Sequence, residues 1–314
     1  MKPENGYIAF IVNPKAGSSS SKPLGRRFAA HLREQGFDVR TYTTVYADHA
    51  TELAERAAGD YGCALIVAVG GDGTIREVAH GLEGGNKPLM MVPHGTENLL
   101  ASELGFDENL KTLIRTFDRE YVKTLDLGRC NERCFTSIAG FGFDGQVVNR
   151  VHRRRAGHIT HLDYFWPIWR SFSEYKFRPM KVEVDGEEIF DGPGLVFIGN
   201  ISRYSVGLKI LEQADFSDGL LDVCIYKCAS RRHLAKHSVL TLFKGHSKSG
   251  DVIYRQGKDI NISSEYSDIF TQIDGDPGPP LPAHITVIPG AVNVMIPKGA
   301  KPAGIKTRIL RALA

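Results

Sequence analysis

The first third of the chain alternates short apolar runs with polar, glycine-bearing loops and helical stretches. Apolar runs at residues 7–12, 64–69 and 89–92 each end at a polar loop. Leucine and phenylalanine recur at helical spacing over residues 23–35, and residues 99–104 form a shorter helical pattern. Alternating strands and helices of this kind predict a parallel sheet, whose strand-end loops gather at one edge and form one candidate pocket.

From about residue 125 the pattern changes to that of hairpins. Asp185-Gly186 separates two strand-like runs at residues 181–184 and 187–190. This pattern predicts an antiparallel β domain. Its other predicted elements are strands at residues 195–198 and 221–226, a helix over 231–243, two closing strands within 285–296 and a terminal helix in the basic tail after Lys298.

Length and composition indicate a globular protein of two lobes. The 314 residues are 42% apolar and 24% charged, which excludes a disordered or collagen-like chain, and no apolar stretch is long enough to span a bilayer. The net charge of +3 is too small to indicate a nucleic-acid partner. The start of the chain lacks a signal-peptide pattern and the five cysteines are scattered, so we expect a cytoplasmic protein.

Four of the cysteines form two CxxxC pairs, Cys130/Cys134 and Cys224/Cys228. Four thiolates could bind zinc, but ligand pairs of that kind usually stand on tight turns. Cys224 and Cys228 instead fit one face of a strand. We therefore favour small buried hydrophobic side chains over a zinc site.

The loop Gly70-Gly71-Asp72-Gly73-Thr74 follows an apolar strand and is the strongest candidate for phosphate binding. Its glycines allow a bulky anion to approach the backbone. Thr74 and Glu77 have capping-box spacing, so a helix is expected to start at Thr74 with its amides toward the loop. Asp72 would repel bare phosphate, which indicates a role through magnesium, a ribose hydroxyl or a loop amide. The alternative is a tight turn whose aspartate caps its neighbours.

Two familiar nucleotide motifs give little support. The Walker sequence GxxxxGK[ST] is absent. A GxGxxG string occurs at Gly140–Gly145, but it lies where the alternation of strands and helices has ended. We favour a glycine-rich β turn there over a nicotinamide site.

A basic and aromatic segment spans residues 152–177. It admits three interpretations: a helix that buries one face, a lipid-access surface, or a surface that stacks single-stranded nucleic acid. We favour the buried helix, with His158 and His161 exposed or packed in the core rather than bound to metal. The helical spacing rests on Phe165, Ile168, Trp169 and Phe172, and the basic residues are Arg153, Arg154 and Arg155.

Several motifs, in this order and spacing, resemble the diacylglycerol kinase catalytic-domain family, which includes bacterial soluble lipid kinases and sphingoid-base kinases and is distantly related to NAD kinases. The match spans nearly the whole chain. Its motifs are Asn13-Pro14-Lys15-Ala16-Gly17, Gly70-Gly71-Asp72-Gly73-Thr74, Pro93-His94-Gly95-Thr96-Glu97-Asn98, the segment Asp215–Asp222 and the segment Gln272–Pro277.

The resemblance implies a Rossmann-like three-layer α/β lobe at residues 1–126 and an antiparallel β-sandwich lobe at 127–296, with ATP held between them. A tail at residues 297–314 follows the second lobe, and one expected arrangement is that it packs back on the first lobe. The nucleotide contacts carried over by motif are Asn13, Pro14, Lys15, Ala16, Gly17, Gly70, Gly71, Asp72, Gly73, Thr74, Arg76, Thr96 and Asn98, with Thr44 a looser match.

The same resemblance implies Mg²⁺ at Asp215, Asp218 and Leu220, and a catalytic carboxylate at Asp276. Asp274 would support Asp276, and Asp72 would join the magnesium network. Three residues depart from the family pattern. Asp276 stands where relatives usually carry glutamate, Arg76 replaces a frequent asparagine and Leu99 replaces a common aspartate.

The sequence therefore predicts an ATP- and Mg²⁺-dependent lipid kinase of phospholipid biosynthesis. We expect it in the cytoplasm, in peripheral contact with the inner membrane face, acting on diacylglycerol or a related long-chain alcohol and binding no nucleic acid. Two alternatives stay open: a kinase for NAD or another soluble metabolite, and a non-catalytic nucleotide- or lipid-binding protein. A homo-oligomer is compatible with the sequence.

Overall fold

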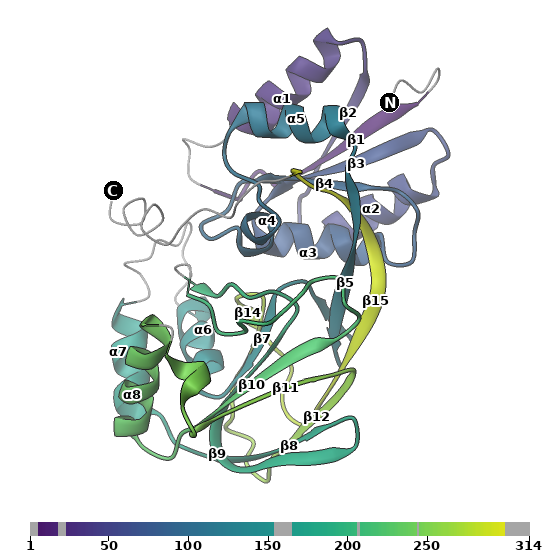
Figure 1. The fold of residues 1–314 in the computed structure, drawn as a ribbon. Helices are drawn as coiled ribbons and strands as arrows, with labels where there is room; N and C mark the ends of the chain where they lie inside the picture. The colour runs from purple at the N-terminus through teal and green to yellow at the C-terminus, as the bar shows by residue number, and fades with distance from the viewer. Residues whose placement is uncertain (1–5, 18–22, 154–164, 206–207, 244, 299–314) are drawn as a thin grey trace. The chain divides into compact units, whose positions relative to one another are not determined.

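The structure is a computed structural model that describes residues 6–17, 23–153, 165–205, 208–243 and 245–298 (Figure 1). These residues form two compact units. The first contains the chain up to Leu125 and from Gly290 onward, and the second contains Asp126–Pro289. The chain passes between the units within two strands, β5 (Val122–Cys130) and β15 (Ala283–Met295). The predicted domain ranges stay predictions, and the tail after Lys298 lies outside the described residues.

A parallel sheet forms the centre of the first unit. Its strands are β1 (Tyr7–Val12), β2 (Asp38–Thr43), β3 (Cys63–Gly70) and β4 (Leu89–Pro93), in the order β2-β1-β3-β4. The end of β15 pairs with β4, also in parallel. Nearly every residue of β1 and β3 is buried, as expected of central strands covered on both faces.

Five helices accompany this sheet: α1 (Pro23–Glu34), α2 (His49–Gly59), α3 (Asp72–Gly81), α4 (Leu99–Glu103) and α5 (Leu110–Arg119). Figure 1 shows α1 and α5 on one side of the strands and α2 and α3 on the other. The three-layer α/β prediction is therefore confirmed. The predicted strand at residues 7–12 agrees with β1 residue for residue.

The second unit is a sandwich of antiparallel strands, as predicted. One layer contains β8 (Pro179–Val184), β12 (Asp259–Ser263) and the first part of β15, and the other contains β7 (Ile138–Phe141), β10 (Leu221–Lys227), β11 (Val252–Gly257), β13 (Thr271–Ile273) and β14 (Asp276–Pro277). The long strand β9 (Glu187–Gly199) pairs with both layers. The short strand β6 (Arg133–Phe135) pairs with β5.

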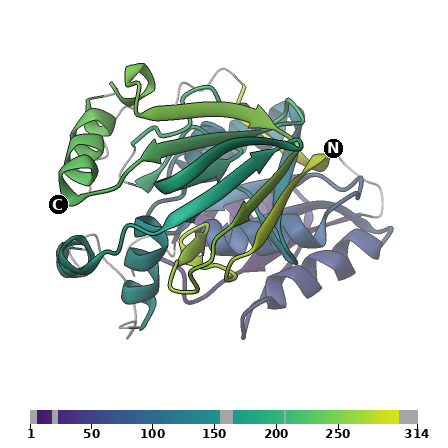
Figure 2. The same ribbon diagram turned by 90° about the horizontal axis from the view of Figure 1, so that it is seen from below.

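Figure 2 shows the long teal and green strands of this unit running side by side. Aliphatic side chains from both layers, among them Val182, Ile198 and Ile260, fill the space between them. A second apolar cluster, around Phe197 and Tyr226, lies on the other face of the layer that holds β10. The helices of this unit are α6 (Phe143–Arg153), α7 (Phe165–Glu174) and α8 (Arg231–Leu242), followed by a 3-10 turn, His246–Lys248. None of the described helices is both long and apolar enough to cross a membrane.

Two expectations from the pattern are wrong. Residues 285–296 form one strand rather than two, since β15 continues through Gly290, where φ is +58°. The glycines at 140–145 are not a β turn: β7 ends at Phe141, Gly142 has φ +102°, and α6 begins at the next residue. Because β7 pairs antiparallel on both sides, this is no dinucleotide-binding unit either.

The basic and aromatic segment is only partly described. Its helix α7 exists, but the Trp169 side chain is 61% exposed instead of buried, and Phe172 is only partly buried. Arg154, Arg155, His158 and His161 lie outside the described residues.

The cysteines behave as buried apolar side chains. All five are free and buried. Cys130 lies in the cluster between the two layers, whereas Cys224 and Cys228 belong to the cluster on the outer face. Burial raises the pKa of each of these three thiols to about 12, so they stay protonated at neutral pH.

We predict that Phe28→Ala destabilises the first unit by about 3–5 kcal/mol. The ring is fully buried, and its centroid lies 5.8 Å from that of Phe10 and 6.3 Å from that of Phe117. Chemical denaturation would measure the change in the free energy of unfolding. Tyr61→Ala is the matched control, because Tyr61 is fully exposed and its loss should cost no more than about 0.5 kcal/mol.

Candidate nucleotide-binding and catalytic sites

Helix α3 begins at Asp72, two residues before the predicted start. Gly71 is its N-cap and, having no side chain, leaves the first amides of the helix without a side-chain cap. The Thr74–Glu77 capping box is therefore wrong. The Glu77 carboxylate instead accepts a hydrogen bond from Ala50 N at 3.2 Å, on the neighbouring helix α2. Uncapped amides at a helix start bear partial positive charge and are available to an anion.

Two glycine-containing loops come into direct backbone contact beside this helix start. A Cβ atom added to Gly95 would lie 2.6 Å from Gly71 Cα, so only glycine fits at that position without a backbone shift. His94 N donates to Gly70 O at 2.9 Å. Asn98 closes the second loop from inside: its Oδ1 accepts from Gly95 N at 2.7 Å and its Nδ2 donates to Gly95 O at 2.9 Å.

A third loop joins them from the end of β1. Asn13 Oδ1 accepts from Lys15 N at 2.9 Å, and Asn13 Nδ2 donates to the Thr74 hydroxyl at 3.0 Å. Because β1, β3 and β4 are adjacent and parallel, these three loops lie at one edge of the sheet, as the sequence predicted. Thr44 follows β2 at the same edge, where its amide donates to Val12 O at 2.9 Å.

The predicted nucleotide-binding residues differ in what their side chains do. Pro14, Lys15 and Thr96 are exposed, whereas Thr44, Thr74, Arg76 and Asn98 are buried. Asp72 Oδ1 accepts from Leu100 N, in the first turn of α4, at 3.3 Å, and the three roles considered for Asp72 stay predictions. The edge thus combines a helix start that has no side-chain cap with an exposed lysine, an arrangement suited to a polyphosphate.

In the second unit, Asp274 fixes the turn that carries Asp276. Asp274 has φ +48° and stands between β13 and β14. Its carboxylate accepts four hydrogen bonds of 2.9–3.1 Å, from Thr136 N, Thr136 Oγ1, Ser137 N and Ile138 N. Gln272 adds a further tie, since its Oε1 accepts from Gly275 N at 2.8 Å. Asp274 is therefore a positioning residue for the turn.

The Asp276 side chain is partly accessible beside a guanidinium group. It is 29% exposed, and its Oδ2 lies 3.6 Å from Arg133 Nη2. Arg133 also donates through Nη1 to Pro277 O at 2.6 Å, so the arginine is itself anchored. This arrangement holds a carboxylate in a defined place while leaving an oxygen accessible.

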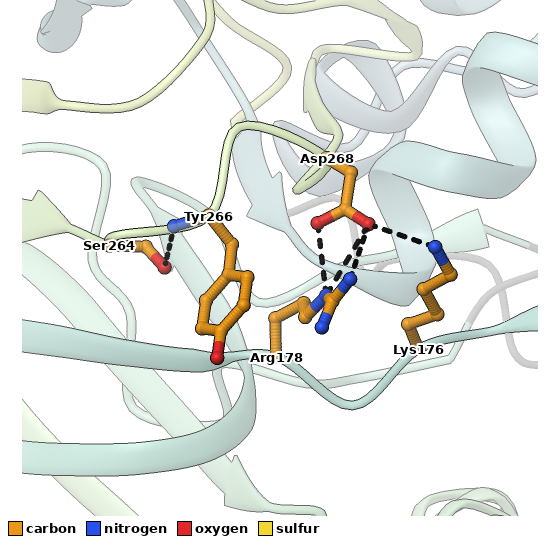
Figure 3. Close-up of polar contacts among 5 residues, drawn as sticks. All are labelled: Lys176, Arg178, Ser264, Tyr266 and Asp268. Atoms are coloured by element: carbon orange, nitrogen blue, oxygen red, sulfur yellow. Dashed lines mark hydrogen bonds and ion pairs between the residues drawn. The ribbon is translucent and has the colours of Figure 1, made fainter.

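The segment that enters β13 is held by the contacts drawn in Figure 3. Arg178 donates from Nε and Nη2 to the two oxygens of Asp268, each at 3.0 Å, and Lys176 lies 3.4 Å from the same carboxylate. The Arg178 guanidinium also lies 4.3 Å from the centre of the Tyr266 ring. Each contact is half-exposed and weak alone, but together they hold residues 264–268 against the start of β8.

The predicted metal residues lie in a loop shaped by carboxylates. Asp215 Oδ1 accepts from Ser217 N at 3.0 Å and Asp218 Oδ1 accepts from Leu220 N at 3.0 Å. Asp126, which the sequence reading missed, accepts from Gly219 N at 2.6 Å. Burial, followed by the charges of Asp215 and Asp126, raises the pKa of Asp218. The only sequence signal for Asp126 is an acidic residue between two buried leucines, Leu125 and Leu127.

A second acidic residue missed by the sequence reading is buried near the catalytic turn. Asp144 lies in the first turn of α6, where the Tyr204 hydroxyl donates to its Oδ1. Its Oδ2 is buried beside the Gln272 amide without good hydrogen-bond geometry. Burial raises the pKa of Asp144 to about 6, and the contacts with Tyr204 and Gln272 oppose that shift only in part.

Comparisons with known proteins agree over nearly the whole chain. The model of the diacylglycerol kinase catalytic domain matches residues 7–130, and that of the YegS C-terminal NAD kinase beta sandwich-like domain matches residues 137–296. A protein named diacylglycerol kinase from Mycobacterium tuberculosis is 31% identical over 303 residues, covering 94% of this chain and 96% of its own. Another of that name from Staphylococcus epidermidis is 28% identical over 292 residues, covering 92% and 91%.

Solved structures share the fold. The crystal structure of a diacylglycerol kinase from Bacillus anthracis has a TM-score of 0.72 at 21% identity, covering 96% of this chain and all of that chain. The crystal structure of a putative diacylglycerol kinase from the same organism has a TM-score of 0.76 at 22% identity, with the same coverage.

We predict that Asp144→Asn becomes more stabilising, relative to the wild type, as pH rises from 4.5 to 7.5. The folded protein keeps the Asp144 proton up to a pKa of about 6, while the unfolded chain releases it near the ordinary aspartate pKa of 3.8. The wild type therefore loses stability between pH 4.5 and 7.5, by roughly 2 kcal/mol, and the variant does not.

Denaturant titrations at several pH values would measure this difference. Asp191→Asn is the control, because Asp191 is exposed on β9 and should give a difference that does not change with pH. The same pH-independent difference for Asp144→Asn would contradict a buried, raised-pKa carboxyl group.

Proposed function

The chain belongs to the diacylglycerol kinase family, and we propose that it transfers the γ-phosphoryl group of ATP to the hydroxyl of a lipid, with diacylglycerol or a related long-chain alcohol as acceptor. Its place would be phospholipid metabolism at the inner face of the membrane. The lipid assignment is supported by the relatives that carry the name diacylglycerol kinase, which match along more than nine-tenths of their length.

The observation that carries the proposal is the contact between Gly71 and Gly95 beside the uncapped start of α3. Phosphoryl transfer asks an enzyme mainly to position the phosphates and to neutralise their charge. The backbone at Gly71 and at Gly73 can approach the phosphates closely because neither of these residues has a side chain. Lys15, exposed on the neighbouring loop, adds a mobile positive charge.

Asp276 is the general base of the proposed reaction. It would accept the proton of the lipid hydroxyl as the oxygen attacks the γ-phosphorus, and the bond from that phosphorus to the β-γ bridging oxygen of ATP would break. The partial exposure of Asp276 leaves an oxygen accessible to the substrate. Asp274 contributes by holding the turn, because its own oxygens are occupied by four hydrogen bonds.

The donor set of the Asp215–Leu220 loop suits Mg²⁺. Asp215 and Asp218 offer carboxylate oxygens, Leu220 offers a carbonyl oxygen, and the carboxylate of Asp126, on β5, accepts a hydrogen bond from Gly219 of this loop. Such hard oxygen ligands are those that magnesium prefers. When bound, the ion would supply positive charge to the loop and to groups hydrogen-bonded to it. Burial and, after it, the charges of Asp215 and Asp126 raise the pKa of Asp218, and a bound cation would oppose this effect.

We predict magnesium-dependent transfer of labelled γ-phosphate from ATP to one lipid in mixed micelles. The panel contains diacylglycerol, a sphingoid base, ceramide and a polyprenol, with NAD and no acceptor as the other arms. Asp276→Asn should lower turnover by about 10² to 10⁴, because the proton acceptor is lost. Asp191→Asn, an exposed carboxylate on a strand of the same unit, should leave turnover unchanged.

Each outcome of that assay decides a different point. Label in NAD alone would replace the lipid kinase with a soluble-metabolite kinase. No label in any acceptor, with ATP still bound, would favour a non-catalytic binding protein. Near-normal turnover of a folded Asp276→Asn protein would remove Asp276 from the role of base.

We also predict that Gly95→Ala weakens the binding of a non-hydrolysable ATP analogue by about tenfold or more. The added methyl group would force the Gly71 backbone out of its present place, from a contact of 2.6 Å. Titration calorimetry would measure the affinity. Gly59→Ala is the matched control, since a Cβ there meets nothing within 4 Å. Unchanged affinity of a folded Gly95→Ala protein would place the nucleotide elsewhere.

A further inference from the structure

Helix α8 and the residue that follows it expose three large apolar side chains, while two polar side chains of the helix are buried. The Val239, Leu242 and Phe243 side chains are 55%, 57% and 77% exposed. Arg232 and Lys236, exposed on the same helix, precede them at the spacing of one helix face. The buried positions of the helix are Leu234, His237 and Thr241. A helix of a protein that meets only water would have the opposite arrangement.

Hydrogen bonds to the buried polar groups fix this orientation. The Thr241 hydroxyl lies 2.9 Å from the Tyr226 hydroxyl, and His237 Nε2 lies 3.0 Å from Lys227 O. Rotating the helix to cover Leu242 would break both contacts and leave buried polar groups without partners. The outward apolar side chains are therefore a stable feature of the fold.

Helix α7 continues the same surface. Arg231, at the start of α8, donates from Nε to Phe172 O at 3.2 Å and from Nη2 to Ser173 O, so the two helices are tied together. Figure 1 shows both helices on the same side of the second unit. Trp169 of α7 is 61% exposed. Of the five large apolar side chains exposed among the described residues of the second unit, four belong to this surface; the fifth is Tyr266.

We call the outward side chains of Trp169, Arg232, Lys236, Val239, Leu242 and Phe243 the α7–α8 face. The charge of the surrounding chain has one sign: residues 228–250 contain five lysines and arginines and no aspartate or glutamate. Some of this charge is locally balanced, since Lys236 pairs with Asp251 at 2.5 Å and Arg170 of α7 pairs with Glu174 at 2.8 Å. The remainder is positive.

We propose that the α7–α8 face docks on the surface of an anionic lipid bilayer. Trp169, Leu242 and Phe243 would enter the boundary between head groups and acyl chains, and Arg232 would meet the lipid phosphates. A second copy of the chain fits less well, because a two-fold dimer would set this positive surface against itself. The inference rests on the proposed function in one respect, that the acceptor lies in a membrane.

Vesicle sedimentation without ATP tests the docking separately from catalysis. The vesicles are phosphatidylcholine alone or phosphatidylcholine with phosphatidylglycerol. The wild type should bind the anionic vesicles more tightly. Leu242→Ser with Phe243→Ser should weaken that binding by about tenfold or more, because two apolar side chains no longer enter the boundary. Arg232→Glu should weaken binding to the anionic vesicles only. Tyr61→Ser, an exposed aromatic residue of the first unit, is the matched control and should bind as the wild type does.

Tryptophan fluorescence is a second measurement of docking and is made on the folded protein. The chain has two tryptophans, so Trp166→Phe leaves Trp169 as the only one. Its emission should shift to shorter wavelength with anionic vesicles and be quenched by brominated acyl chains. Absence of both effects, or equal vesicle binding by the serine variant, would overturn the proposal. Self-association of the wild type that the serine variant loses would overturn it too, in favour of a dimer interface.

Transfer activity distinguishes the failure of docking from that of the proposed function. If both proposals hold, the serine variant loses activity on long-chain diacylglycerol in vesicles but keeps it on a short-chain, dispersed diacylglycerol. Equal loss on both substrates would show that the α7–α8 face serves the catalytic reaction rather than docking. If no lipid is phosphorylated but the wild type binds vesicles through this face, the docking inference stands and the kinase proposal fails.

Discussion

The backbone contact between Gly71 and Gly95 is the constraint on which the first unit's candidate site depends. Two loops from adjacent parallel strands meet without any side chain between them, and Asn98 holds the second loop in shape. The absence of side chains has two consequences: it allows the loops to meet, and it leaves the amides at the start of α3 unhindered. The same glycines therefore serve the packing and the proposed phosphate site.

In the second unit, aspartate carboxylates fix the shape of two loops. Asp274 organises the turn before Asp276 through four hydrogen bonds, and Asp126 holds Gly219 beside the predicted metal residues. In both cases a buried or half-buried acid accepts hydrogen bonds from backbone amides, which stabilise its charge. The acids left accessible, such as Asp276, are those assigned to chemistry.

The sequence predicted most of the elements and the gathering of three loops at one sheet edge, because both follow from short-range pattern. It failed where distant residues decide. Helix α3 begins two residues before the predicted start, because the Glu77 carboxylate accepts a hydrogen bond from Ala50 N of α2 instead of capping its own helix. Asp126 and Asp144 were missed because their partners, Gly219 and Tyr204, are far away along the chain. Periodicity placed Trp169 on a buried face, since it cannot say which face of a helix meets the core.

Asp276 illustrates how the structure narrows a question that the sequence left open. A carboxylate one methylene shorter than the family's glutamate could be offset by a shifted loop or reflected in weaker activity. Asp274 ties the turn to the segment between β6 and β7 and to the first residue of β7, and Gly275 N donates to Gln272. Pro277 O accepts from Arg133 of β6. A shift of about 1 Å would strain several of these bonds together, each worth on the order of 1 kcal/mol. In the proposed reaction, the acceptor hydroxyl would therefore have to come to the carboxylate, and the shape of the acceptor would decide turnover.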